Sequence, residues 1–124
     1  MDQDALVAEG QVLVQLLDQS SIKPRAAIWV YNSEVDTWRL WIVPSSQTTD
    51  KFEFFNAVAN VISNNRDRLP SLDIGLIDFR TDKDPAMQGL GQAFHLDGIG
   101  SLRLTNNRFN GFFLPDGVVL RMAI

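Results

Sequence analysis

The chain contains no cysteine and only one histidine, His95, among its 124 residues. Without cysteine it has no disulfide, thiolate nucleophile or thiolate zinc site, and one histidine cannot build a multi-histidine metal site within one chain. The sequence also lacks an apolar run near the roughly 18 residues that a membrane span needs. Its acidic start, Met1-Asp-Gln-Asp4, lacks the basic region of a signal peptide. We therefore predict a cytoplasmic location.

Basic residues are outnumbered, with 11 lysines and arginines against 15 aspartates and glutamates. Because sequence-independent affinity for nucleic acids or anionic membranes comes mainly from lysine and arginine, we expect neither as a partner. The hydrophobic share of 45% and the charged share of 21% are typical of a globular protein. We find no internal repeat or linker, so we predict a single domain over residues 1–124.

Apolar spacing predicts three helices, over 5–19, 50–69 and 84–94. Asp50 and the Asp84-Pro85 pair are predicted helix starts, and Gly10 indicates that something packs closely on the first helix. Runs of β-branched and aromatic residues predict strands over 25–31, 37–43, 72–79, 101–105, 109–114 and 118–122. The sequence thus predicts an α+β fold in the order α-β-β-α-β-α-β-β-β. Its mixed sheet would hold about six strands, with 72–79 central and the last three as an antiparallel meander.

The first two strands should form a hairpin across the loop 32–36. If this five-residue loop sets the register, Val30 lies opposite Trp38 and Ile28 opposite Leu40. The reverse face then carries Trp29, Tyr31, Arg39 and Trp41. Each large aromatic side chain can bury about 150–250 Å², so we expect something to cover this face. Either a helix of the chain packs there, or a second copy or another protein does.

A second candidate site is the group of carboxylates at and after the strand 72–79, chiefly Asp78, Asp82 and Asp84. Oxygen ligands at a strand end can hold Mg²⁺ for phosphoryl chemistry, which would make the protein a metal-dependent phosphoester hydrolase. The alternative is structural, because Asp84 suits a helix cap and Asp82 suits a turn. We favour the structural alternative.

Several segments of this chain resemble a family of small uncharacterised bacterial proteins. They are Ala27-x-Trp29-x-Tyr31, Trp38-Arg39-Leu40, the helix start Asp84-Pro85 and the stretch Gly98-Ile-Gly-Ser-Leu-Arg-Leu-x-Asn106-x-x-x-Asn110-Gly111. The resemblance covers most of the chain. It implies a compact domain of bacterial origin, and it implies nothing about activity, substrate or catalytic residues.

We therefore expect a non-enzymatic binding or assembly module without a cofactor. It would form a homodimer or dock a protein partner through Trp29, Tyr31, Arg39 and Trp41, which belong to the residue types enriched at interface hot spots. No catalytic residue is assigned. The alternative function is the hydrolase with Asp78, Asp82 and Asp84 as metal ligands.

Overall fold

The computed structural model describes residues 3–45, 50–105, 107–109, 112–114 and 116–124. Within these ranges the chain forms the helices α1 (Gln3–Asp18), α2 (Lys51–Asn64) and α3 (Pro85–Ala93), and a short 3₁₀ turn, η1 (Ile74–Leu76). The strands are β1 (Ala26–Asn32), β2 (Thr37–Val43), β3 (Ile77–Phe79), β4 (Leu102–Leu104), β5 (Asn107–Phe109), β6 (Phe112–Leu114) and β7 (Gly117–Met122).

The main sheet has five strands in the order β3-β2-β1-β7-β4. β3 runs parallel to β2, and the other neighbouring strands are antiparallel. The predicted α+β class with a mixed sheet is confirmed, with five strands in place of about six. The expected central strand 72–79 is wrong: only Ile77–Phe79 is extended, since residues 74–76 form η1, and β3 lies at an edge of the sheet.

The prediction of a three-stranded C-terminal meander is also wrong. β4 pairs directly with β7, whereas β5 and β6 pair only with each other in a separate two-stranded sheet. The predicted strand 109–114 is therefore two short strands, and β5 and β6 contact α3. Three residues of the family pattern lie outside the described residues: Asn106, Asn110 and Gly111.

The hairpin register differs from the prediction by one residue. Asn32 pairs with Thr37, so the loop has the four residues 33–36, and Asp36 takes a left-handed backbone conformation with φ of 49°. Trp29 consequently lies opposite Leu40, and Val30 lies opposite Arg39. Because side chains alternate between the faces of a sheet, a shift of one residue moves a whole strand's side chains to the other face.

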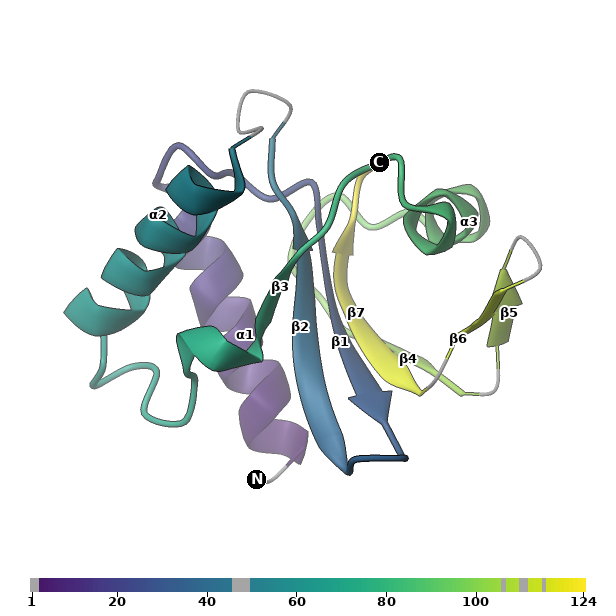
Figure 1. Ribbon diagram of the computed structural model, residues 1–124, viewed down its shortest axis with the longest axis horizontal. Helices are drawn as coiled ribbons and strands as arrows, with labels where there is room; N and C mark the ends of the chain where they lie inside the picture. Colours follow the sequence, from purple (N-terminus) through teal and green to yellow (C-terminus); the bar gives the residue numbers. More distant parts are fainter. Residues whose placement is uncertain (1–2, 46–49, 106, 110–111, 115) are drawn as a thin grey trace.

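Helices cover both faces of the sheet (Figure 1). One face packs on α1 and α2 through a cluster that includes Trp29, Leu40, Phe54 and Leu120. The opposite face packs on α3, where Met87 and Leu90 meet residues such as Ile28 and Val119. The hairpin tip and the start of α1 lie together at the lower end of the molecule (Figure 1).

The helices α2 and α3 begin at the residues that the sequence predicts. The carboxylate of Asp50 accepts a hydrogen bond from the Phe52 amide at 2.8 Å, and that of Asp84 accepts one from the Ala86 amide at 2.9 Å. Both caps are confirmed. Apolar spacing in the sequence puts Phe52 on the inner face of this helix, but the structure leaves its side chain 77% exposed and buries Phe54 instead. The stripe that α2 buries runs at four-residue steps from Phe54.

Candidate functional site

Trp29, the centre of the predicted docking face, lies under α1 and is only 1% exposed. Its indole Nε1–H donates to the backbone carbonyl of Leu6 at 2.9 Å. Gly10 explains the close approach of the helix, because a Cβ atom at this position would lie 2.5 Å from the Trp29 Nε1. A helix of the chain itself therefore covers Trp29, which is the first of the two arrangements that the sequence left open for this side chain.

Arg39 and Trp41 lie on the opposite face of the sheet from Trp29 and Tyr31, as the register requires. Arg39 donates two hydrogen bonds to Asp78, at 2.8 and 2.7 Å. These bonds raise the pKa of Arg39, although burial acts in the other direction. The Trp41 ring is covered by the guanidinium of Arg80, whose Cζ lies 4.1 Å from the ring centroid. The four predicted binding residues thus do not form one surface.

The carboxylates proposed as metal ligands each bind a different arginine. Asp78 pairs with Arg39, Asp82 pairs with Arg25 at 3.0 Å, and Asp84 pairs with Arg80 at 3.1 Å while capping α3. In the part of the chain that the structure describes, no three histidine, aspartate or glutamate side chains are grouped to hold a metal ion. The structure does not bring Asp78, Asp82 and Asp84 together as a metal site.

Tyr31 and Trp38 form a cross-strand aromatic pair where β1 and β2 extend past the start of α1. Their ring centroids are 5.1 Å apart, with the planes inclined at 44°, and both residues are half-buried. The Tyr31 hydroxyl donates to the Asp36 carboxylate at 2.5 Å. This hydrogen bond favours the neutral phenol and raises the pKa of Tyr31 above 10. Trp38, which was predicted to lie opposite Val30 on the other face from Tyr31, thus shares a face with Tyr31 and is part of the surface.

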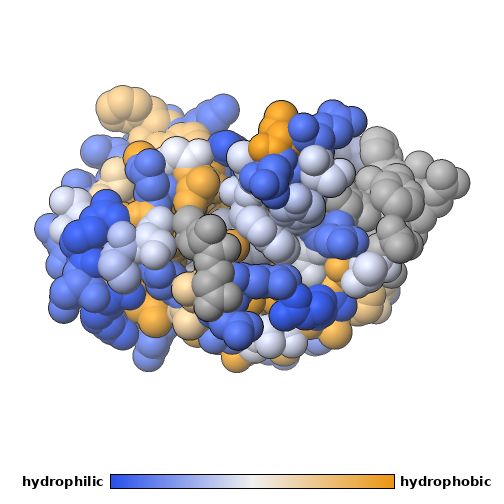
Figure 2. Space-filling view, turned by 90° about the horizontal axis from the view of Figure 1, so that it is seen from below, coloured by the Kyte–Doolittle hydropathy of each residue, from blue (hydrophilic) through white to orange (hydrophobic). Residues whose placement is uncertain are grey.

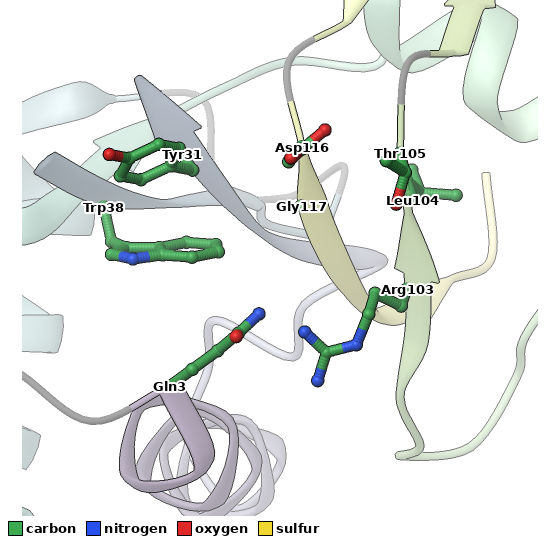
Figure 3. A pocket seen from close by; sticks show the side chains of 8 residues that line it. All are labelled: Gln3, Tyr31, Trp38, Arg103, Leu104, Thr105, Asp116 and Gly117. Carbon is green, nitrogen blue, oxygen red and sulfur yellow. The ribbon is translucent and has the colours of Figure 1, made fainter. Parts of the chain in front are cut away.

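The aromatic pair forms one wall of a pocket of about 370 Å³ (Figure 3). We call it the aromatic–arginine pocket; besides the pair it is lined by Gln3, Arg103, Thr105 and Asp116, and by Leu104 and Gly117. The Gln3 amide and the Arg103 guanidinium both point into the space beside the Trp38 ring (Figure 3). Side chains from α1, from the hairpin and from β4 therefore converge on one space.

Arg103 differs from the arginines of the ion pairs. Arg25, Arg39, Arg80 and Arg121 each bind an aspartate, the last at 2.7 Å from Asp18. Arg103 is exposed, and among the described residues none forms an ion pair or hydrogen bond with its guanidinium. The register of β4 with β7 places it on the face that α1 covers, since it lies opposite Val118 of that core.

The surface around this end of the molecule is mixed. Seen from below, hydrophobic residues are scattered in separate areas among hydrophilic ones (Figure 2). Such a surface favours recognition of a small group in a pocket over docking through a broad apolar face.

Comparison with protein-family models, with curated proteins and with solved structures found no match to this chain. The resemblance to a bacterial family stays a prediction. In the described residues, no helix is long and apolar enough to cross a membrane.

Proposed function

We propose that the protein is a non-enzymatic binding module whose ligand site is the aromatic–arginine pocket. The observation that supports this most is the position of the half-buried Tyr31–Trp38 pair beside Arg103, a guanidinium without a partner among the described residues. Tyrosine, tryptophan and arginine are enriched among the residues that dominate binding energies. Of the four residues predicted for binding, Tyr31 alone belongs to this pocket.

The lining indicates the chemistry of the ligand. Two rings held against each other by strand pairing offer an apolar surface with little conformational entropy left to lose. A free guanidinium matches the two oxygens of a carboxylate. A volume of about 370 Å³ lies at the lower end of the range for small-molecule sites. We therefore expect a ligand that carries an apolar or planar group close to a carboxylate.

The expected partner is the one predicted from the sequence, another protein or a second copy of this chain. A protein partner would present this ligand group on its surface, and a second copy of the chain is the alternative that the first experiment also detects. The cytoplasmic location and the bacterial origin stay predictions, as does the absence of a cofactor.

The test is an NMR titration with phenylacetate, which joins a phenyl ring to a carboxylate. The chain has three tryptophans, so its indole N–H signals are few and Trp38 is assigned through the Trp38→Leu variant. We expect the Trp38 signal to shift on titration while the signal of Trp29, buried under α1, stays in place. The Arg103→Gln variant should lose this shift.

Arg68→Gln is the matched control, because Arg68 is also exposed but does not line the pocket. It should titrate as the unaltered protein does. The proposal is wrong if the Trp38 signal does not respond to phenylacetate, or if Arg103→Gln and Arg68→Gln respond alike.

A further inference from the structure

Two aspartates of the chain are followed directly by glycine: Asp97 by Gly98 and Asp116 by Gly117. In such a pair the backbone amide of the glycine can attack the side-chain carboxyl carbon of the aspartate, because glycine has no Cβ atom to shield that amide. The attack needs an exposed peptide whose backbone can turn. The surroundings of each pair therefore decide whether it reacts, and the structure gives the two pairs opposite surroundings.

Asp97 and Gly98 lie on an exposed bend between α3 and β4. Just before the bend, Leu96 exchanges two backbone hydrogen bonds with Met122 of β7, at 2.8 and 3.0 Å. Beyond this anchor, none of the described residues accepts a hydrogen bond from the Gly98 amide. A Cβ atom at Gly98 would find nothing within 4 Å. The Gly98 amide therefore has room to turn toward the Asp97 side chain.

The Asp116–Gly117 pair is held by strand pairing. The Asp116 carbonyl accepts a hydrogen bond from the Tyr31 amide at 2.8 Å, which fixes the plane of the peptide that contains the Gly117 amide. Gly117 itself is buried at the start of β7, and a Cβ atom there would overlap the Trp29 carbonyl oxygen. β7 also lies between β1 and β4. This amide reaches the Asp116 carboxyl only when the strands separate.

A proton donor lies beside the Asp97 carboxylate. His95 Nε2 is 2.8 Å from Asp97 Oδ1. When the Gly98 nitrogen bonds to Cγ of Asp97, the bond between Cγ and Oδ1 breaks and this oxygen leaves as water. One proton of the water comes from the attacking amide, and the other comes from protonated His95 acting as a general acid. The product is a cyclic succinimide.

We propose that Asp97 is a modification site at which the folded chain itself forms a succinimide and then isoaspartate. Water opens the ring by breaking the bond between the Gly98 nitrogen and one of the two ring carbonyl carbons. Where the Asp97 backbone carbonyl is released, the chain continues through the former side-chain carbon. The product has one more backbone carbon and a free α-carboxylate, which is the group that isoaspartyl methyltransferases modify. Neither residue lines the aromatic–arginine pocket, so this inference is independent of the proposed function.

The experiment incubates the folded protein in warm neutral buffer and measures isoaspartate by methyltransferase labelling and by mass spectrometry of tryptic peptides. Asp97 lies in the peptide 84–103 and Asp116 in the peptide 109–121, so the two pairs are measured separately. Deamidation of Asn110 in the second peptide changes its mass, whereas isomerisation does not. Since a strand residue reacts only in its opened fraction, isoaspartate at position 97 should exceed that at 116 by at least about tenfold.

Two substitutions test the two reacting groups. Gly98→Ala has open space for its Cβ atom, so the free energy of unfolding should stay the same, but the shielded amide should react several-fold more slowly. His95→Asn should slow the reaction by about tenfold, since it removes the general acid. Gln92→Ala is the control, because it changes an exposed side chain of the same segment and leaves the His95–Asp97 pair intact. It should react at the unaltered rate.

The synthetic peptide 84–103, incubated in the same buffer, shows that the conditions support the reaction. If this peptide reacts and the folded protein forms no isoaspartate at position 97, or forms equal amounts at 97 and 116, the modification site is wrong. A Gly98→Ala variant that reacts at the unaltered rate would overturn attack by the exposed amide. If His95→Asn and Gln92→Ala react alike, His95 is not the proton donor.

Discussion

Replacing Gly10 with alanine tests the packing of α1 on the sheet, which covers Trp29 and leaves Tyr31 and Trp38 beyond the start of the helix. An alanine Cβ would lie 2.5 Å from the Trp29 Nε1 and 2.7 Å from Leu120 Cδ1. Ordinary contacts of a Cβ atom begin near 3.4 Å. The indole or the helix must therefore move by about 1 Å. Trp29 has no space for this, being 1% exposed and bonded to the Leu6 carbonyl.

Two costs oppose one gain in Gly10→Ala. Overpacking a core costs about 1–3 kcal/mol, and a buried hydrogen bond that is lost costs about 1–3 kcal/mol. Alanine in a helix gains about 1 kcal/mol over glycine. We expect the free energy of unfolding to fall by roughly 3 kcal/mol. Urea denaturation followed by circular dichroism measures this change, and the Trp29 indole signal in NMR should move.

Gly91→Ala is the matched control in α3. Its Cβ would meet the Ile124 side chain at 3.4 Å, which is ordinary contact, so the helical gain of up to about 1 kcal/mol should remain. The reasoning is refuted if Gly10→Ala is as stable as the unaltered protein with an unchanged Trp29 signal, or if both substitutions change stability alike.

Other substitutions test single contacts. Glu9→Ala leaves the amides of residues 71 and 72 without the carboxylate oxygen that accepts from both, so the free energy of unfolding should fall by about 2 kcal/mol; an unchanged urea midpoint would contradict this. Arg121→Gln removes a bidentate ion pair with Asp18, and we expect the free energy of unfolding to fall by roughly 2–3 kcal/mol in the same assay. An unchanged free energy of unfolding would show that this ion pair does not stabilise the fold. Tyr31 is the only tyrosine, so tyrosinate absorbance reports its titration directly. Its raised pKa means that the bond to Asp36 stabilises the folded state below pH 10 and is lost as pH rises through the folded pKa; Asp36→Asn should lower that pKa toward 10, and a pKa unaffected by this variant would show that the bond is not formed.

The sequence predicted most of the elements because periodicity and capping are local. Asp50 and Asp84 cap their helices as expected, and Gly10 marks a close contact. The predicted faces of the hairpin were wrong because the loop is one residue shorter than expected. Asn32 joins β1 and its side chain accepts from the Glu34 amide at 3.0 Å, which is turn chemistry that favours the shorter loop. With that register, the pairing of Tyr31 with Trp38 follows from the sequence.

The rest of the candidate site could not be predicted from local patterns. Arg103 lines the same pocket as the aromatic pair because β4 pairs with β7, whereas the meander predicted from the sequence would place another strand between β4 and β7. The arginine partners of Asp78 and Asp82 likewise come from other strands or loops, 39 and 57 residues away. Contacts over such separations depend on strand order, which no short motif in this chain specifies.

The most direct measurement is a crystal structure of the protein with phenylacetate bound. We predict that the phenyl ring lies against Trp38 and that the carboxylate pairs with Arg103. Phenylacetate bound anywhere else, or an Arg103 guanidinium that the ligand leaves untouched, would contradict the account.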